Sequence, residues 1–278
     1  MTGEEEIKRA CVLGWPVSQS LSPKLHGWWL RKYGFPGAYT AMAIPADNLQ
    51  AALSLLVDRG FAGCNLTAPL KELAMPLMQS HDESCLMSGA INTVVIKNGK
   101  LHGYNSDGFG FIESLKAQYP KWNGDRVVII GTGGASRGII ASLRAAGAKH
   151  FVLVNRTPEK AAKVIKAFTL DGEVYTWEQR HAALKNATLL VNCSTLGMVG
   201  HPPSQIDLAN LPKEAAVCDI VYRPLMTDLL NSAKRRGNPV IEGLGMLLHQ
   251  GRLGFEHWYG RDPEVTPDLY KYMGELAS

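Results

Sequence analysis

The chain has 278 residues, of which 46% are hydrophobic and 19% are charged. These values are typical of a folded globular protein and exclude a disordered, collagenous or coiled-coil chain. The formal net charge of +4 is spread thinly, and its only basic cluster, at residues 234–236, falls where we expect a helix to end. Nucleic-acid binding usually needs a basic face or stripe, so we expect no nucleic-acid partner.

The cysteines and the hydropathy pattern indicate the cellular setting. The five cysteines lie far apart and form no C-x-x-C pair, so we expect neither a metal site nor a dense disulfide framework. Residues 1–9 are acidic and polar, unlike a signal peptide, and no apolar run approaches the roughly 18 residues of a membrane span. We therefore expect a cytoplasmic protein without a membrane partner.

The N-terminal part of the chain alternates short apolar runs with helical patterns. Residues 93–97 and 100–104 are expected to form a hairpin that turns at Asn98-Gly99. Strands that alternate with helices predict βαβ units and a mostly parallel sheet. The expected strands are residues 11–14, 39–44 and 63–66, and the expected helices are residues 23–33, 46–59, 71–78 and 108–118.

The polar segment at residues 119–125 indicates a linker before a second series of elements. The sequence therefore predicts an α/β fold with two domains, an N-terminal α/β substrate domain at residues 1–108 and a Rossmann-type domain at residues 109–244. The expected strands of the second domain are residues 126–130, 151–154, 173–176, 188–192, 216–221 and 239–242, and its expected helices are residues 135–146, 158–168 and 227–236.

A glycine-rich loop follows the strand expected at residues 126–130 and opens a helix, which is the context of a dinucleotide-binding turn. Gly131 permits the tight turn, and Gly133 lets backbone N–H groups approach a pyrophosphate at the positive end of the helix dipole. We expect Gly138 to allow close packing of the helix on the strand. A purely structural turn is the alternative interpretation. The candidate cofactor-binding residues of the loop are Gly131, Thr132, Gly133, Gly134 and Ala135.

The next expected strand ends at Asn155, Arg156 and Thr157, where an NAD-specific fold places an acidic residue against the ribose 2′-hydroxyl. An amide, a guanidinium and a hydroxyl suit the 2′-phosphate of NADP instead. Charge-assisted hydrogen bonds of about 1.5 to 3 kcal/mol correspond to a preference for NADP of roughly 10- to 150-fold. Thr157 also fits a helix cap followed by Pro158, and this interpretation is compatible with cofactor binding.

Paired serines mark the first candidate substrate-binding segment. Ser20 and Ser22 precede the helix expected at residues 23–33, and two hydroxyls beside a helix N-terminus form a neutral receptor for a carboxylate. Ser22 followed by Pro23 also fits a simple N-cap. The sequence leaves both interpretations of Ser22 open.

A lysine and an aspartate are the candidate acid/base groups. Asn65 and Thr67 lie on one side of an extended segment, and Lys71 follows in the first turn of a helix, where a cation is unfavourable. Asp107 follows the expected hairpin and either caps the next helix or faces Lys71. If the two side chains meet, they form a pair that can transfer a proton, which is worth about 10² to 10⁴ in rate.

Separated motifs along residues 14–250 resemble, in order, those of the shikimate dehydrogenase family, which includes quinate dehydrogenases. In the first half, S-x-S-P begins at Ser20, N-x-T-x-P-x-K at Asn65, G-A-x-N-T at Gly89 and N-T-D-x-x-G at Asn105. In the second half, the matching segments are the G-x-G-G loop at residues 131–134, N-R-T at residues 155–157, and residues 192–198, 219–224 and 243–250.

The resemblance implies NADPH-dependent reduction of 3-dehydroshikimate to shikimate, the fourth step of the shikimate pathway toward aromatic amino acids. It implies Lys71 and Asp107 as the proton-transfer pair and C-terminal helices, at residues 245–278, that return to pack on the first domain. It also implies Ser20, Ser22 and Tyr222 as binding residues for the carboxylate, Asn65, Thr67, Asn92, Asp107 and Gln250 for the rest of the substrate, and Thr195, Gly243 and Met246 for the cofactor.

The chain departs from the family pattern at few positions. Gln19 stands where many members have histidine, and Ser106 replaces the usual threonine. A quinate or dual-specificity dehydrogenase is therefore the close alternative. A non-catalytic NADP-binding sensor is the alternative from another class, and retention of both Lys71 and Asp107 argues against it. A homodimer is an open alternative to a monomer.

Overall fold

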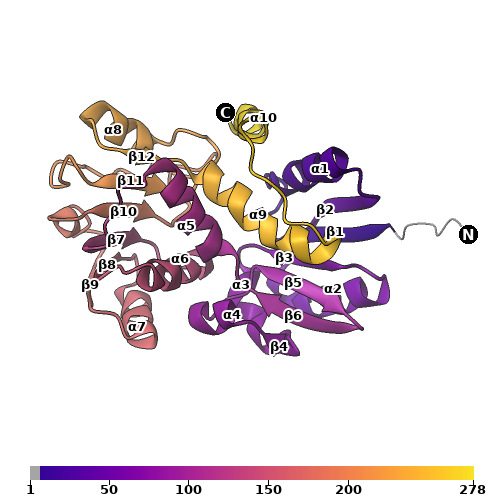
Figure 1. Ribbon diagram of the computed structural model, residues 1–278. Coiled ribbons are helices and arrows are strands. Elements are labelled where there is room, and N and C mark those ends of the chain that lie inside the picture. Colours follow the sequence, from indigo (N-terminus) through magenta and orange to yellow (C-terminus); the bar gives the residue numbers. More distant parts are fainter. Residues whose placement is uncertain (1–6) are drawn as a thin grey trace, which may run out of the picture.

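Two six-stranded sheets lie side by side, and helix α9 (Gly243–Tyr259) runs from one to the other (Figure 1). This computed structural model describes residues 7–278. Helices pack against both sheets, which confirms the expected α/β class with a Rossmann-type second half. None of the helices within the described residues is long and apolar enough to cross a membrane.

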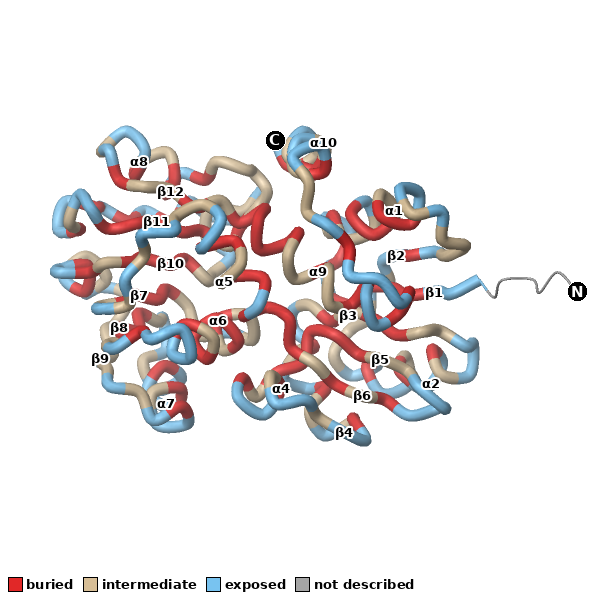
Figure 2. Tube along the Cα trace, in the orientation of Figure 1, coloured by how far each residue is buried: buried red, intermediate tan, exposed pale blue. Residues whose placement is uncertain are grey.

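The first sheet is mixed rather than wholly parallel. Strand β1 runs parallel to its neighbours β2 and β3, whereas β5 pairs antiparallel with β3 and β6. The expected hairpin is confirmed, and both Asn98 and Gly99 have positive φ, as its tight turn requires. Figure 2 shows β1 as mostly buried. The sheet order is β2-β1-β3-β5-β6-β4, formed by β1 (Lys8–Gly14), β2 (Gly37–Ala43), β3 (Gly63–Leu66), β4 (Ser80–His81), β5 (Thr93–Lys97) and β6 (Lys100–Tyr104).

The prediction of a helix at residues 71–78 is wrong. Residues 71–78 form a single turn, α3 (Leu70–Leu73), followed by the 3₁₀ turn η2 (Met75–Leu77). Pro76 explains the break, because it lacks an N–H group and its ring clashes with the preceding turn of a helix. The sequence interpretation also missed β4 and α4. The remaining helical elements are α1 (Ser22–Tyr33), η1 (Ala46–Asn48), α2 (Leu49–Asp58) and α4 (Glu83–Ser88).

The second sheet is parallel throughout and has the Rossmann strand order β12-β11-β10-β7-β8-β9. The chain reverses its direction of strand addition between β7 and β10, and ligands of such sheets bind outside the carboxyl ends of the strands at this point. The strands are β7 (Arg126–Ile130), β8 (His150–Val154), β9 (Gly172–Tyr175), β10 (Leu189–Asn192), β11 (Ala216–Asp219) and β12 (Val240–Ile241), and the helical elements are α5 (Asp107–Gln118), α6 (Gly134–Ala145), α7 (Pro158–Phe168), η3 (Ala182–Leu184) and α8 (Asp228–Arg236).

The C-terminal helices return to the first sheet, as expected. Near the end of α9, Trp258 Nε1 donates to the carbonyl oxygen of Val94 on β5 (3.1 Å), and the hydroxyl of Tyr259 donates to that of Ala38 on β2 (3.1 Å). Helix α10 (Pro267–Ala277) packs against α1 and α9. Trp29 is buried in the hydrophobic cluster formed by α1, α9 and α10, while Trp28 packs on Tyr272 of α10.

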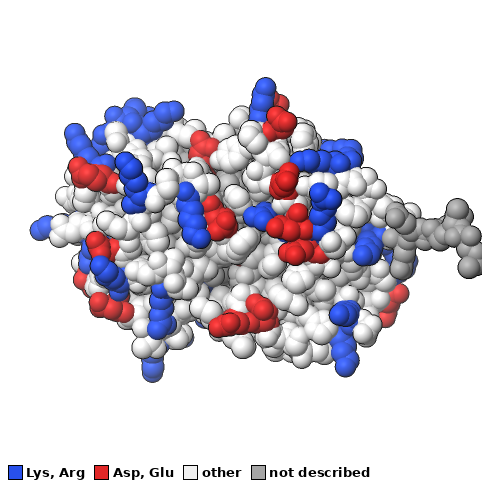
Figure 3. All heavy atoms as spheres, in the orientation of Figure 1, with Lys and Arg blue, Asp and Glu red and all other residues white. Residues whose placement is uncertain are grey.

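Charges of both signs share the surface of the protein. On the face in Figure 3, blue lysine and arginine side chains alternate with red aspartate and glutamate side chains over both halves of the molecule. Residues 234–236 lie in the last turn of α8, where cations suit the helix dipole. The basic cluster thus has the helix-end position expected from the sequence.

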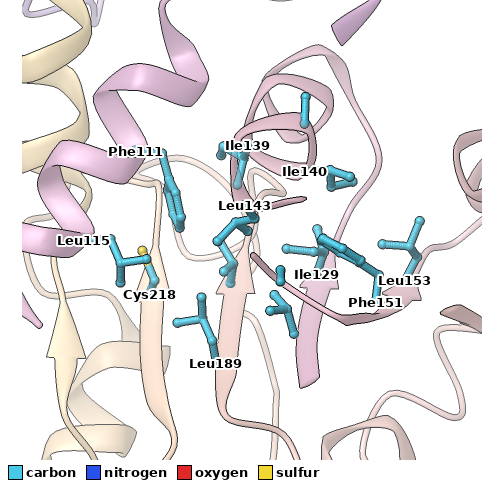
Figure 4. Packing of buried hydrophobic residues seen from close by; sticks show 14 of the residues in the cluster. Phe111, Leu115, Ile129, Ile139, Ile140, Leu143, Phe151, Leu153, Leu189 and Cys218 are labelled. Carbon is cyan, nitrogen blue, oxygen red and sulfur yellow. The ribbon is translucent and has the colours of Figure 1, made fainter. Parts of the chain in front are cut away.

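The core beneath α5 and α6 fixes the two helices that carry the candidate site. Figure 4 shows Phe111 and Leu115 of α5 beside Ile139 and Leu143 of α6, packed over strand residues such as Ile129. All five side chains are 1% exposed or less. Burying each contributes roughly 1.5 to 3 kcal/mol, so the start of α5 and the start of α6 have little freedom to separate.

Candidate active site

Lys71 and Asp107 form a buried ion pair. Lys71 lies on the single turn α3, Asp107 is the first residue of α5, and the Lys71 Nζ to Asp107 Oδ2 distance is 2.6 Å. Their side chains are 12% and 1% exposed. Of the two interpretations of Asp107, the structure therefore selects the contact with Lys71 over a helix cap. A buried ion pair adds little to the stability of the fold. Buried ionisable groups with a charged partner are common in active sites.

The second oxygen of the aspartate has its own donor. Asn92 Nδ2 donates to Asp107 Oδ1 (2.9 Å), and the Asn92 amide is itself oriented because its Oδ1 accepts the backbone N–H of Ser106 (2.8 Å). Asn105 Oδ1 accepts the backbone N–H of Asp107 (3.0 Å). The carboxylate is thus held at both oxygens and at its backbone, which leaves one defined geometry for the pair.

The glycine-rich helix α6 packs directly on this pair. A Cβ atom at Gly134 would lie 3.1 Å from Cβ of Lys71, and one at Gly138 would lie 2.7 Å from Oδ1 of Asn105 and 3.2 Å from Cβ of Asp107. Gly138 therefore allows helix α6 to approach the start of α5 closely. The prediction that Gly138 packs on a strand is wrong. The ion pair and the candidate cofactor loop are immediate neighbours.

The loop has the geometry that a pyrophosphate needs. Gly131 has a φ of +88°, which L residues with side chains rarely adopt, and a Cβ at Gly133 would meet nothing within 4 Å. The backbone is therefore open to a ligand at the N-terminus of α6, a helix of 12 residues. Thr132 and Ala135 lie on the same loop and first turn.

The next strand ends in an exposed basic corner. Arg156 and Thr157 are exposed after β8, and Asn155 Nδ2 donates to the carbonyl oxygen of Thr157 (2.8 Å). Thr157 is the N-cap residue of α7, but its side chain makes no capping hydrogen bond, and Pro158 stands at the first helical position as expected. Of the other candidate cofactor residues, Thr195 is exposed, whereas Gly243 and Met246 are buried at the start of α9.

The paired serines meet a tyrosine from the other half of the chain. The backbone N–H of Ser22 donates to Ser20 Oγ (3.3 Å). The N-cap of α1 is Leu21, without a side-chain hydrogen bond, so the N-cap interpretation of Ser22 is wrong. Burial raises the pKa of Tyr222, and its contacts with the Leu21 backbone and the Ser20 side chain oppose that rise. Tyr222 follows β11, so this contact joins the two halves of the molecule.

The remaining candidate substrate residues differ in how their polar atoms are used. Gln250 Oε1 is buried and has no hydrogen-bond partner within the described residues. Thr67 is half-buried. Asn65 has partners at both amide atoms, because its Oδ1 accepts from the Tyr39 hydroxyl (2.6 Å) and its Nδ2 donates to Asn92 and Thr93. Gln250 is therefore free to bind a ligand, whereas the Asn65 amide is already occupied.

A buried carboxyl orders the loops beside Tyr222. Asp219 at the end of β11 accepts from Thr227, from the backbone N–H of Val221 and from Asn192. Burial raises the pKa of Asp219 to about 6, although these three donors lower it in part. Asn192 Nδ2 also donates to the carbonyl oxygen of Leu196, so one carboxyl links both loops that follow β10 and β11. No sequence motif pointed to this function, although Asp219 stands within one of the matched segments.

We expect Asp219→Asn to remove a pH dependence of stability. A carboxyl whose folded pKa is raised costs stability as pH rises from its ordinary value near 3.8 to about 6, by about 2 to 3 kcal/mol in total. Urea unfolding of both proteins between pH 4 and pH 7 measures this difference. As pH rises toward 6, the free energy of unfolding of Asp219→Asn should increase relative to that of the wild type. A constant difference at every pH would contradict the expectation.

Known proteins match the chain over nearly its whole length. Models described as the shikimate dehydrogenase substrate binding domain, shikimate/quinate 5-dehydrogenase and the shikimate 5′-dehydrogenase C-terminal domain match residues 12–94, 113–198 and 243–267. A shikimate dehydrogenase (NADP⁺) of Paramagnetospirillum magneticum is 43% identical over 276 residues, which cover 98% of this chain and 99% of that protein.

Solved structures give the same result. Shikimate 5-dehydrogenase from Thermus thermophilus, in complex with NADP(H) and shikimate, superposes with a TM-score of 0.86 at 36% identity and covers 98% of this chain and 100% of its own. Quinate dehydrogenase from Corynebacterium glutamicum in complex with NAD also has a TM-score of 0.86, at 26% identity, and covers 97% of this chain and 98% of its own. The chain therefore belongs to the shikimate dehydrogenase family of NADP-dependent oxidoreductases.

Proposed function

We propose that the protein reduces 3-dehydroshikimate to shikimate with NADPH and that Lys71 and Asp107 transfer the proton. The observation that carries this proposal is the buried ion pair placed against the first turn of α6, where Gly134 touches Lys71. A hydride donor held by that helix and a proton donor on Lys71 would then serve the same carbonyl group.

The chemistry divides between the cofactor and the chain. Bound NADPH supplies the hydride. As the ketone oxygen gains negative charge, the Lys71 ammonium stabilises it and donates a proton from Nζ. Asp107 Oδ2 holds that ammonium in place, and Asn92 keeps the carboxylate oriented. Close packing of α6 and the start of α5 around the pair excludes water, which strengthens these interactions.

Polar side chains from both halves suit a small hydroxylated acid. We assign the substrate carboxylate to Ser20, Ser22 and Tyr222, which converge at the start of α1. We assign the ring hydroxyls to Thr67 and Gln250, because both amide atoms of Asn92 already have partners within the protein. The buried, unpartnered Oε1 of Gln250 supports this assignment, because a substrate hydroxyl would supply its missing donor. The occupied amide of Asn65 favours a positioning function instead.

The cofactor residues follow from the loop and the basic corner. We assign the pyrophosphate to Gly131, Thr132, Gly133, Gly134 and Ala135 at the N-terminus of α6. Asn155, Arg156 and Thr157 suit the 2′-phosphate, because Arg156 is exposed and has no ion-pair partner in residues 7–278. Thr195, Gly243 and Met246 complete the proposed cofactor surface.

Arg156→Gln tests the 2′-phosphate contact. We expect KM for NADPH to rise roughly 10- to 150-fold, because a charge-assisted hydrogen bond to the phosphate is lost, while KM for NADH stays unchanged. Steady-state kinetics with both cofactors measure the ratio. Lys163→Gln, an exposed cation on α7, is the matched control and should leave the ratio unchanged. Equal effects on NADPH and NADH would contradict the assignment.

The experiment that tests the function itself is the initial rate of NADPH oxidation with 3-dehydroshikimate, beside NADP⁺ reduction with shikimate and with quinate. Fast turnover of the shikimate pair and slow turnover of quinate support the proposal. Preference for quinate would support the alternative that the quinate dehydrogenase neighbour suggests. NADPH binding without turnover of any of these compounds would reject both enzyme assignments and favour a sensor.

A further inference from the structure

A chain of hydrogen bonds links Tyr39 on the edge strand β2 to the ion pair. The Tyr39 hydroxyl contacts Asn65 Oδ1 (2.6 Å), Asn65 Nδ2 contacts Thr93 Oγ1 (3.0 Å), Thr93 Oγ1 contacts Asn92 Oδ1 (2.9 Å), and Asn92 Nδ2 contacts Asp107 Oδ1 (2.9 Å). The links cross from β2 through β3 and β5 to α5. Tyr39, Thr93, Asn92 and Asp107 are each 8% exposed or less.

The direction of every hydrogen bond in this chain is determined. The backbone N–H of Ser106 can only donate, so the Asn92 atom that it contacts is the acceptor Oδ1, and the Nδ2 atom must face Asp107. At the other end, the backbone oxygen of Asn92 can only accept, so the Asn65 atom that it contacts is Nδ2. Asn65 Oδ1 therefore faces Tyr39, and the tyrosine hydroxyl must donate to it.

We propose that Tyr39, acting through Asn65 and Thr93, is a positioning residue for the Asp107 carboxylate. Because each donor points toward Asp107, the tyrosine hydroxyl fixes the rotamer of Asn65, Asn65 and Thr93 fix that of Asn92, and Asn92 orients the carboxylate that holds Lys71. The Tyr39 ring is itself held, since it stacks on His26 with ring centroids 4.0 Å apart. This inference rests on the proposed function of the ion pair.

The arrangement also explains why Tyr39 stays a hydroxyl donor. Burial raises the pKa of Tyr39 well above its ordinary value, so the phenol keeps its proton throughout the working range of an enzyme. The Ser22 side chain lies beside the same hydroxyl and partly opposes the rise. Tyr39 thus stands between the proposed carboxylate-binding serines and the proposed acid/base pair, and it touches no reacting atom.

Two isosteric substitutions interrupt the series of hydrogen bonds at different positions. Tyr39→Phe removes the first donor, and Thr93→Val removes the hydroxyl between Asn65 and Asn92. Each should lower kcat for 3-dehydroshikimate reduction about 5- to 30-fold, the scale of one well-oriented hydrogen bond, with KM for the substrate unchanged within about twofold.

Tyr259→Phe is the matched control. It also removes a partly buried tyrosine hydroxyl that bonds to β2, at the carbonyl oxygen of Ala38, but it lies outside the chain of donors. Thermal unfolding should therefore show similar losses of stability for Tyr39→Phe and Tyr259→Phe. Only Tyr39→Phe should lower kcat while KM for the substrate stays unchanged.

The double variant Tyr39→Phe/Thr93→Val completes the test. Because both substitutions interrupt one chain, the double variant should lose little more kcat than either single variant. The inference is overturned if Tyr39→Phe and Thr93→Val match Tyr259→Phe in kcat, or if the effects of the two single variants on kcat multiply in the double variant. A wild type without any turnover would instead reject the proposed function, so the two failures are distinguishable.

Discussion

Replacing Lys71 by methionine should lower kcat for 3-dehydroshikimate reduction by two to four orders of magnitude, the range expected when a positioned proton donor is lost. Methionine keeps the apolar stem that packs against Gly134 of α6. Asp107→Asn should reduce kcat to a similar degree, because the amide retains the contact with Asn92 but no longer compensates the ammonium. Long, stopped-time assays at high enzyme concentration would measure such slow rates.

The folding of these variants needs its own measurement. Removing one partner of a buried ion pair commonly costs about 3 to 5 kcal/mol, because the other charge stays buried. The double variant Lys71→Met/Asp107→Asn leaves no unpaired charge and should therefore be more stable than Lys71→Met alone. Its kcat should be no lower than that of the single variants, since the two groups act as one unit.

Lys116→Met supplies the matched control for the pair. Lys116 lies on α5, whose first residue is Asp107, and its ion pair with Glu113 is at the surface. An exposed pair of this kind contributes about 1 kcal/mol or less, so the substitution should change neither kcat nor stability appreciably. A Lys71→Met protein that is folded, binds NADPH and retains more than about a tenth of the wild-type kcat would contradict the proposed acid/base function.

The second half of the fold was the more predictable from sequence. Each strand of a parallel sheet covered on both faces needs a continuous apolar run, and residues 127–130 and 189–191 supply one. The glycine turn and the cap-like Thr157-Pro158 then fix where α6 and α7 begin. The first half was harder, because the elements around Pro76 are too short for a periodic pattern to appear.

Site residues that stand in a sequence motif could be predicted. Residues that reach the site only through contacts between distant parts of the sequence could not. Lys71 and Asp107 stand in separate motifs, and their polar contexts at element ends suggested a meeting across 36 positions. Asn65 and Thr67 share one side of an extended segment, yet the Asn65 amide is tied to Tyr39 rather than free. Tyr39 carries no local signal, since a tyrosine on an edge strand is ordinary there. Its partners exist only because the first sheet brings β2, β3 and β5 together.

His26 should make the protein sensitive to acid. The imidazole is 1% exposed, stacks on Tyr39 and lies 5.6 Å from the Trp29 ring, and its Nδ1 has no hydrogen-bond partner in residues 7–278. Burial lowers the pKa of His26 from 6.5 to about 3. Because the unfolded chain protonates more readily than the folded one, the stabilisation is complete above pH 6.5 and is lost as pH falls toward 3, by up to about 5 kcal/mol.

His26→Phe isolates this contribution, because phenylalanine keeps an aromatic ring on Tyr39 and cannot take up a proton. We expect the variant to gain about 3 kcal/mol relative to the wild type when the free energy of unfolding is compared at pH 7.5 and pH 4. The effect is opposite in sign to that of Asp219, which costs stability as pH rises toward 6. The two buried groups therefore offset each other in the wild type at mildly acid pH, and only the single variants separate them.

The control for this measurement is His201→Phe. His201 is exposed in the loop after β10, so its substitution should leave the pH dependence of unfolding as it is in the wild type. Urea unfolding at several pH values, followed by tryptophan fluorescence and circular dichroism, gives all three curves. If His26→Phe and the wild type change in stability in parallel below pH 6.5, the histidine is not buried as a neutral base, and the aromatic cluster around Tyr39 must then be open to water.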